Sequence, residues 1–451
     1  MLEHGPGEQR AARDASRGGA GLRPAGATAA RGVRRYFGTD GVRGVVGQDL
    51  TVELVEQLGK AAALWSGRGR VFVGRDTRGS GPELEEAFAR GVVAAGGNAV
   101  LAGVLPTPAV ALLALDLGVI ISASHNPPEY NGVKFFDGDG NKLTDASEEA
   151  IEALLDAPAP GGGTIDRVDV AEDSYLEHVL ERFGTDLSGL KVAVDCANGA
   201  YFNIAPQAFE RLGADVTAIA IDPNGENINQ GCGATDLKLL QETVRAGGHD
   251  LGIAFDGDGD RILAVDGNGE MVDGDQILAV LALHLGVDLV AVTVMTNLGF
   301  HRLMEERGIR VLTTAVGDRY VLEALRREGG VLGGEQSGHV ICLRDHVTGD
   351  GLAAALLICD AIRGRTLAAA AAVMPRYAQA KEDVPVSRRT DLTSALAEAD
   401  RLNDELAGRG RVLVRASGTE PVVRVLGEAE TDEEARNLCA RIAGLVRREL
   451  G

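Results

Sequence analysis

Three carboxylates stand on alternate residues where the chain reads Asp-Gly-Asp-Gly-Asp-Arg, at residues 256–261. This loop follows the apolar stretch 251–255, and its oxygen atoms can converge on one hard cation. A lone Asp-Gly-Asp is ordinarily a solvated turn, but three Asp directly after a predicted buried strand favour a metal site. The calcium loop of an EF-hand is excluded, because it needs Gly and Glu where this loop has Arg261 and Gly267.

A second Asp-Gly repeat, Asp-Gly-Asp-Gly-Asn, occupies residues 137–141. Asp145 and Glu148 fall at the ninth and twelfth positions of a calcium loop, but Lys142 stands where that loop requires Gly. The preceding residues 133–136 are typical of a strand, whereas an EF-hand needs an entering helix. The sequence therefore predicts a hairpin turn here.

A hydroxyl, an imidazole and an amide follow the apolar run 117–121, where residues 122–127 read Ser-Ala-Ser-His-Asn-Pro. Sites in α/β folds are built at strand ends, so this loop is a candidate for nucleophilic chemistry. On residue types alone, an ordinary Ser/Asn/Pro turn is an equal alternative. The loop is not a Gly-x-Ser-x-Gly hydrolase elbow.

Strands and helices must position these loops. Short β-branched runs alternate with helical patterns through most of the 451 residues. That rhythm predicts βαβ units with mixed or parallel sheets. We expect three similar α/β domains and a smaller C-terminal α+β domain, with the active site in the central cleft. The predicted divisions are a disordered N-terminal extension at 1–33 and domains at 34–169, 170–268, 269–377 and 378–451. Residues 1–33 are mostly Gly, Ala and Arg, which bury little surface.

The bulk composition narrows the class of protein. With 45% hydrophobic and 25% charged residues, the chain has the composition of a globular protein. A net charge of −21 argues against nucleic acid as a partner. The five Cys form no Cys-x-x-Cys pair, which favours a reducing compartment and hence the cytoplasm. Pro106, Pro108 and Asp116 interrupt the apolar stretch 105–121, so we expect buried core there and no membrane partner.

The motifs together resemble the α-D-phosphohexomutase superfamily, in which the Ser directly before His in the second loop is phosphorylated. In this chain that residue is Ser124. The resemblance extends in order through the stretches 38–44 (Gly-Thr-Asp-Gly-Val-Arg-Gly), 256–261, 334–339 (Gly-Glu-Gln-Ser-Gly-His) and 415–421 (Arg-Ala-Ser-Gly-Thr-Glu-Pro). It covers the chain from Tyr36 to the C-terminus.

The resemblance implies roles for particular residues. The implied catalytic residues are Ser124, His125, Lys134, Arg43, Arg261 and His339. The implied substrate-binding residues are Glu335, Ser337, Arg415, Ser417, Gly418 and Thr419. The implied ligands of the cofactor Mg²⁺ are Ser124, through its phosphoryl group, and Asp256, Asp258 and Asp260. Which of His125, Lys134 and His339 transfers the proton stays open.

Two loops are similar to the branch of the superfamily that isomerises phosphorylated glucosamine. They are residues 335–339 (Glu-Gln-Ser-Gly-His) and 316–321 (Val-Gly-Asp-Arg-Tyr-Val). The implied enzyme interconverts glucosamine 6-phosphate and glucosamine 1-phosphate through a phosphoserine and a 1,6-bisphosphate, as a monomer or homodimer. The alternatives are the same chemistry on glucose or mannose phosphates and, from another class, a catalytically silent sugar-phosphate sensor.

Overall fold

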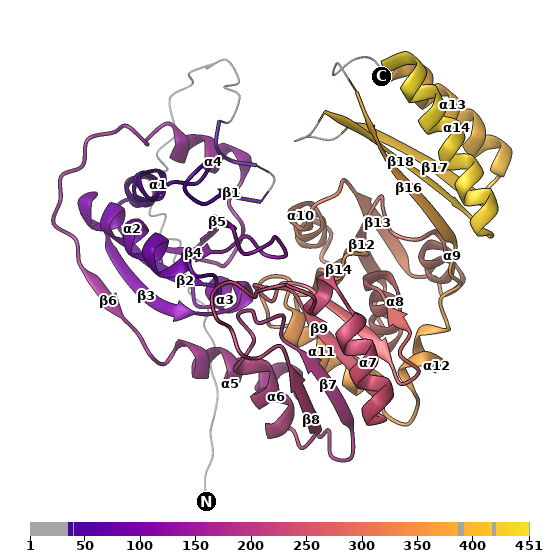
Figure 1. Cartoon of the computed structure of the whole chain (residues 1–451), viewed down its shortest axis with the longest axis horizontal. Coiled ribbons are helices and arrows are strands. Elements are labelled where there is room, and N and C mark those ends of the chain that lie inside the picture. The colour runs from indigo at the N-terminus through magenta and orange to yellow at the C-terminus, as the bar shows by residue number, and fades with distance from the viewer. Residues whose placement is uncertain (1–34, 39, 387–391, 417–420, 451) are drawn as a thin grey trace, which may run out of the picture. The chain divides into compact units, whose positions relative to one another are not determined.

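The computed structural model describes residues 35–38, 40–386, 392–416 and 421–450 (Figure 1). The predicted extension at 1–33 lies outside these residues. The first sheet and its helices comprise β1 (Val42–Val45), α1 (Val52–Trp65), β2 (Arg70–Arg75), α2 (Gly81–Ala94), β3 (Asn98–Val104), α3 (Thr107–Leu112), β4 (Leu117–Ile121), β5 (Tyr130–Asp137), α4 (Asp145–Glu152) and β6 (Ile165–Arg167). Its strand order is β1-β5-β4-β2-β3-β6. The sheet is mixed, because β2, β3, β4 and β6 are parallel while β5 is antiparallel to β4 and to β1.

The second and third sheets are also mixed. The second unit comprises α5 (Ala171–Phe183), β7 (Lys191–Asp195), α6 (Ile204–Arg211), β8 (Asp215–Ile219), η1 (Gly233–Thr235), α7 (Lys238–Gly247), β9 (Leu251–Phe255), β10 (Ile262–Asp266) and β11 (Met271–Val272). The third comprises α8 (Gly274–Leu285), β12 (Leu289–Thr293), α9 (Leu298–Glu306), β13 (Arg310–Thr314), α10 (Asp318–Glu328), β14 (Leu332–Gly334), β15 (Val340–Cys342), α11 (Gly351–Ala361) and α12 (Leu367–Ala371). The strand orders are β11-β10-β9-β7-β8 and β13-β12-β14-β15.

The last unit is smaller and differs in kind. It comprises β16 (Ala378–Pro385), α13 (Thr393–Leu406), β17 (Gly410–Ala416), β18 (Val422–Ala429) and α14 (Asp432–Leu450). The three strands form an antiparallel sheet in the order β16-β18-β17, and the two helices pack on it with their own apolar cluster (Figure 1). The predicted fold class, three α/β units followed by a smaller α+β unit, is confirmed.

Burial of whole strands places the candidate loops. Every residue of β4 and of β9 is buried. Such strands cannot carry polar side chains along their length, so the polar residues of each loop begin where the strand ends. The segment 105–121, predicted as core, contains α3 and β4 and is largely buried. In the described part of the chain, no helix combines the length and apolar character needed to cross a membrane.

The second Asp-Gly repeat forms the predicted turn. Asp137 Oδ1 accepts hydrogen bonds from the backbone N–H groups of Asp139 (3.0 Å) and Asn141 (2.9 Å). Phe136 and Lys142 pair antiparallel across the turn. The Asp137 carboxylate therefore serves the turn itself, which agrees with the rejection of a calcium loop.

Candidate active site

Ser124 lies in the loop after β4 and faces the Asp-rich loop after β9. Its side chain is buried, and its hydroxyl donates a hydrogen bond to Asp256 Oδ2 at 2.5 Å. His125 Nδ1 lies 3.4 Å from the same hydroxyl oxygen. The structure thus brings together two loops that are more than a hundred residues apart in the chain, with a hydroxyl, a carboxylate and an imidazole at their contact.

The three Asp of the loop after β9 converge as predicted. Asp256, Asp258 and Asp260 are buried, and each offers an oxygen atom within 4.8 Å of those of the other two. Asp258 uses Oδ2 to accept hydrogen bonds from Thr107 Oγ1 (2.6 Å) and Lys134 Nζ (2.7 Å).

The remaining oxygens of this cluster fit a cation. Asp258 Oδ1 and Asp260 Oδ1 are buried and receive no hydrogen bond from the described residues. Burying a carboxylate oxygen that receives no hydrogen bond is costly, and a hard cation bound by these oxygens removes that cost. These residues therefore fit a metal ion, and the ligand chemistry suits Mg²⁺ better than zinc because no Cys or His joins the group.

The three candidates for proton transfer differ in charge state. Burial, aided by Arg261 and Arg43, lowers the pKa of His125 to about 4, so its imidazole is neutral near pH 7. Burial alone would lower the pKa of Lys134 and of His339, but neighbouring carboxylates outweigh it and raise both. For Lys134 these are chiefly Asp258 and Asp40. Of the three, His125 alone has its pKa shifted toward the neutral form, the form in which a side-chain nitrogen can accept a proton.

Lys134 and His339 both lie against carboxylates. Lys134 Nζ lies 2.7 Å from Asp258 and 3.4 Å from Asp260. His339 lies between Asp260 (3.7 Å) and Asp318 (3.3 Å). Both side chains are buried.

The two predicted arginines lie beside this cluster. Arg43 forms an ion pair with Asp40, and its Nη1 donates to the carbonyl of Ala123 at 3.5 Å. Arg261 Nε lies 3.8 Å from Asp260 Oδ1. Arg261 also lines a pocket together with His125 and Asp256, so its guanidinium can reach a bound anion.

The predicted sugar loop follows β14. Glu335 Oε1 accepts a hydrogen bond from the backbone N–H of Gly317 at 3.0 Å, and Ser337 lines the pocket. Gln336, between them, lines the same pocket: its Nε2 donates to Asp275 at 3.1 Å, and Lys381 Nζ on β16 donates to its Oε1 at 2.7 Å. The loop is thus tied to the last unit of the chain.

The predicted phosphate loop is described only at its start. Arg415 lies near the end of β17, opposite Arg424 on β18. Burial and the nearby Arg424 lower the pKa of Arg415, and its Nε is buried without a hydrogen-bond acceptor among the described residues. An anion would satisfy such a guanidinium. Ser417, Gly418 and Thr419 lie outside the described residues.

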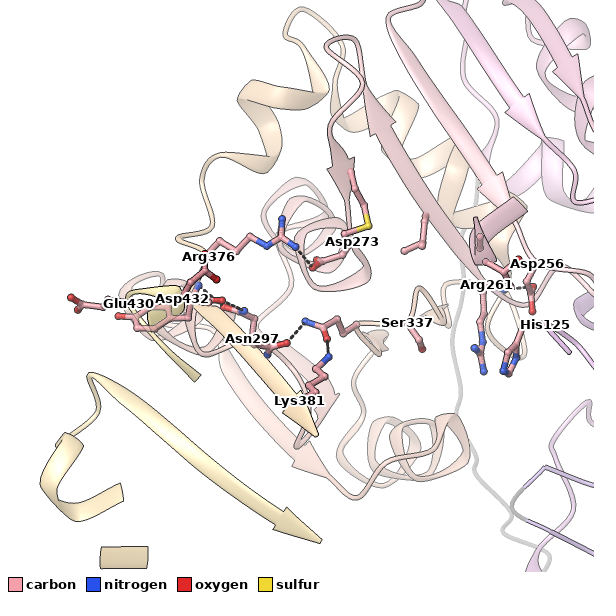
Figure 2. Close-up of a pocket in the computed structure, with 18 of the residues that line it drawn as sticks. His125, Asp256, Arg261, Asp273, Asn297, Ser337, Arg376, Lys381, Glu430 and Asp432 are labelled. Atoms are coloured by element: carbon pink, nitrogen blue, oxygen red, sulfur yellow. Dashed lines mark hydrogen bonds and ion pairs between the residues drawn. The ribbon is translucent and has the colours of Figure 1, made fainter. Parts of the chain in front are cut away.

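One pocket of about 1020 Å³ joins several of these groups. Figure 2 shows His125, Asp256 and Arg261 together toward one end, with Ser337 nearer the middle. Toward the other end lie Arg376, Glu430 and Asp432. The pocket is large enough for a small phosphorylated sugar.

Sequence reasoning missed several residues that support the site. Thr107 on α3 binds Asp258, and Lys142 pairs with Asp40 (2.8 Å) and Asp318 (2.5 Å) beside His339. Arg78 contacts the loop that contains Ser124. The one available signal was that Arg78 follows β2, where residues 75–78 read Arg-Asp-Thr-Arg, polar residues at a strand end like those of the recognised loops.

Comparison with known families assigns most of the described region. Four models of the phosphoglucomutase/phosphomannomutase family match in order: alpha/beta/alpha domain I at 34–160, domain II at 173–269, domain III at 273–377 and the C-terminal domain at 372–445. The chain belongs to the phosphoglucomutase/phosphomannomutase family. The predicted class of enzyme, an isomerase of the phosphohexomutase type, is thereby confirmed.

Within the family, the chain is similar to phosphoglucosamine mutase of Streptomyces griseus, with 49% identity over 453 residues that cover 92% of this chain and 100% of that protein. Among solved structures, a phosphoglucomutase/phosphomannomutase family protein of Burkholderia thailandensis matches with a TM-score of 0.78 and 25% identity, covering 92% of this chain and 97% of that one. The Aspergillus fumigatus N-acetylphosphoglucosamine mutase in complex with GlcNAc-6P and magnesium shares the fold, with a TM-score of 0.68 at 21% identity over 92% of this chain and 96% of that one.

Proposed function

We propose that the chain is a mutase that interconverts glucosamine 6-phosphate and glucosamine 1-phosphate. The observation that carries the proposal is the contact between the Ser124 hydroxyl and Asp256, which joins the candidate nucleophile to a cluster with free carboxylate oxygens. The likeness to phosphoglucosamine mutases supports glucosamine as the sugar. The product would feed the synthesis of UDP-N-acetylglucosamine and cell-wall precursors.

The reaction moves a phosphoryl group without consuming another reactant. The phosphorylated Ser124 gives its phosphoryl group to the free hydroxyl of the sugar monophosphate, which becomes a 1,6-bisphosphate while the serine hydroxyl is regenerated. The bisphosphate then turns over, and Ser124 takes back the phosphoryl group from the other end. One proton leaves the attacking hydroxyl in each half, and His125, neutral and 3.4 Å from Ser124 Oγ, is the favoured acceptor.

We assign the metal site to Asp256, Asp258 and Asp260 with one oxygen of the phosphorylated Ser124. Mg²⁺ bound there would supply electrostatic stabilisation of the charge that develops on the transferred phosphoryl group. The residues themselves hold the serine against the carboxylates and, through Thr107 and Lys134, fix Asp258. The magnesium in the Aspergillus fumigatus relative supports this choice of ion.

The sugar phosphate would be held by residues from the third and fourth units. We propose that Glu335 and Ser337 bind sugar hydroxyls, and that Arg415 with Ser417, Gly418 and Thr419 binds the phosphate that does not react. Arg43 and Arg261 would neutralise charge at the reacting phosphoryl group. Lys134 and His339 would assist from their positions beside the carboxylates of the metal site. The division into domains at 34–169, 170–268, 269–377 and 378–451 is proposed on the same basis.

The enzyme would act in the cytoplasm, as a monomer or homodimer, and would bind neither nucleic acid nor a membrane. The net charge of −21 supports the proposal that the chain does not bind nucleic acid.

Substrate profiling tests the proposal. Purified protein is assayed with glucosamine, glucose and mannose 6-phosphates, with Mg²⁺ and a trace of the matching 1,6-bisphosphate. We expect the highest kcat/KM for glucosamine 6-phosphate, and intact mass should show one added phosphoryl group that a phosphatase removes. A preference for glucose or mannose phosphates would shift the assignment to the rival mutase. Binding without turnover of any of them would indicate the sensor.

A further inference from the structure

Arg78 is the largest fully buried side chain in the described part of the molecule, and it lies just after β2. Its guanidinium has five N–H donors. Nε donates to Asp76 Oδ2 at 2.9 Å. The two terminal nitrogens donate to main-chain carbonyls of the loop that contains Ser124, as follows: Ser124 (2.9 Å), Asn126 (2.8 Å), Tyr130 (3.0 Å) and Pro127. Five donors thus meet five acceptors.

The loop that Arg78 holds has a conformation that the chain does not favour. Ser124 has a backbone φ of +53°, in the left-handed region that residues other than Gly rarely adopt. Such a conformation is strained and persists only when the surroundings fix it. The conformation aims the Ser124 hydroxyl at Asp256.

The N–H of Ser124 is held as well as its C=O. The Ser124 N–H donates to Ser122 Oγ at 2.9 Å, and the Ser122 hydroxyl donates to Asp76 Oδ2 at 2.6 Å. Asp76 thereby connects both sets of bonds, because the same oxygen accepts from Arg78. A second side chain, Asn229, approaches from the neighbouring unit and donates through Nδ2 to the carbonyls of Ser124 (2.9 Å) and Asn126 (3.1 Å).

We propose that Arg78 is a positioning residue for phosphoryl transfer, which rests on the proposed function of Ser124. Together with Asn229 it fixes the main-chain carbonyls around Ser124, so that the serine oxygen stays in line with the carboxylate cluster. The buried carbonyls would lose their donors without it, and the loop would relax toward ordinary backbone angles. Lys cannot replace Arg here, because an ammonium group has three donors and no planar fork.

The expected effect lies on the chemical step and not on sugar binding. Glu335, Ser337 and Arg415 belong to other loops, so Arg78→Lys should leave the KM for glucosamine 6-phosphate within about threefold. A misplacement of about 1 Å can reduce turnover about 100-fold, and we expect a fall in kcat of that size. Transfer of a phosphoryl group from the 1,6-bisphosphate to dephosphorylated Ser124, followed by intact mass, should slow to the same extent.

Two further variants separate positioning from loss of fold. Arg75→Lys is the matched control, since Arg75 lies at the same strand end, pairs with Glu85 (3.3 Å) and donates to the carbonyl of Asp76 rather than to the Ser124 loop. It should keep its kcat. Arg78→Ala should regain turnover when guanidinium at low millimolar concentration is added, because the small cation can occupy the vacated space and donate to the same carbonyls.

The wild-type enzyme distinguishes this proposal from the proposed function, because a wild type without mutase turnover would refute the function and not the positioning. With an active wild type, an unchanged kcat in Arg78→Lys would overturn the proposal. So would an equal loss in Arg75→Lys. If Arg78→Lys fails to fold, Asn229→Ala decides: a selective fall in kcat supports the fixed loop, and normal kcat overturns it.

Discussion

The two oxygen atoms of Asp258 differ in their hydrogen bonding. Oδ2 accepts hydrogen bonds from Thr107 and Lys134, whereas buried Oδ1 has no donor among the described residues. The bonds to Oδ2 fix the side-chain rotamer of Asp258. Oδ1 is therefore held in one orientation within the carboxylate cluster. Partners behind a metal ligand commonly orient it in this way. The carboxylate is therefore prepared for a cation before the cation arrives.

Asp258→Asn should weaken Mg²⁺ binding and turnover together. The substitution removes one negative charge from a site with oxygen ligands, and it also leaves the Lys134 ammonium with one carboxylate fewer. We expect the Mg²⁺ concentration for half-maximal activity to rise at least tenfold, as measured by titration of turnover with MgCl₂. Asp139→Asn, in the other Asp-Gly repeat, is the control and should change neither quantity. Full activity of Asp258→Asn in excess chelator would refute the metal assignment.

Ser124→Ala should abolish nearly all turnover while the protein stays folded. The substitution removes only the hydroxyl group, and no other described hydroxyl donates to Asp256. Ser122→Ala should reduce turnover less, because Ser122 Oγ contacts Asp76 and the Ser124 N–H instead of the cluster. Initial rates with glucosamine 6-phosphate and circular dichroism of both variants make the comparison. The reverse ranking would move the nucleophile to Ser122.

At the scale of elements, strand ends explain what the sequence could predict about the site. The apolar runs that became β4 and β9 were recognisable, so the loops after them were predicted at the correct places. The supporting contacts were not predictable in the same way. Lys142 follows β5 and Asp318 begins α10, and their 2.5 Å ion pair arises only when two separate units pack together. No local sequence pattern around Lys142 or Asp318 predicts that the two residues form an ion pair.

Lys142→Met tests how much that packing contributes. The Lys142 ammonium is nearly buried between Asp40 and Asp318, so its removal leaves two carboxylates with reduced compensation. Breaking a buried pair costs about 3–5 kcal/mol, and we expect a clear fall in the thermal midpoint. Lys191→Met is the control, because Lys191 pairs with Asp215 at 3.9 Å on the surface, where such a pair contributes about 0–1 kcal/mol. Equal midpoints in the two variants would contradict a structural role for Lys142.

Helix α9 adds a pH dependence through His301. Burial, then Arg411, lowers the pKa of His301 to about 4, whereas an unfolded chain titrates near about 6.5. Between these values the unfolded state binds a proton that the folded state does not, so stability falls as the pH falls from about 6.5 to 4. His301→Gln should make the thermal midpoint less dependent on pH over that range. An equally shallow profile for His284→Gln on α8 would contradict the assignment to His301.

At the scale of the whole molecule, the order of the motifs along the sequence predicts the order of the structural units, because each motif lies within one unit. What it could not give is how the units meet. Arg78 and Asn229 reach the Ser124 loop from two different units, and Gln336 joins the sugar loop to β16. These contacts depend on the packed arrangement of the sheets, and their residues look like ordinary polar residues of turns in the sequence.

A truncation at the N-terminus tests which residues the enzyme needs. Residues 1–32 are poor in large apolar side chains, and the first family model matches from residue 34. From Arg35 onward the backbone is held, because Glu152 on α4 accepts hydrogen bonds from the N–H groups of Arg35 (3.0 Å), Tyr36 (2.5 Å) and Phe37 (3.1 Å). Deletion of residues 1–32 should therefore leave both the thermal midpoint and Mg²⁺-dependent turnover unchanged.

Deletion of residues 1–37 is the matched control, since it removes those three donors and the buried ring of Phe37. The centre of that ring lies 5.7 Å from the centre of the Phe135 ring, in the apolar cluster between the first sheet and its helices. Loss of a buried Phe side chain alone costs about 3–5 kcal/mol, so this longer deletion should lower the thermal midpoint and reduce the yield of active protein. Differential scanning calorimetry and initial rates on both proteins provide the comparison. A large loss in the shorter deletion would show instead that residues before Arg35 pack on the enzyme.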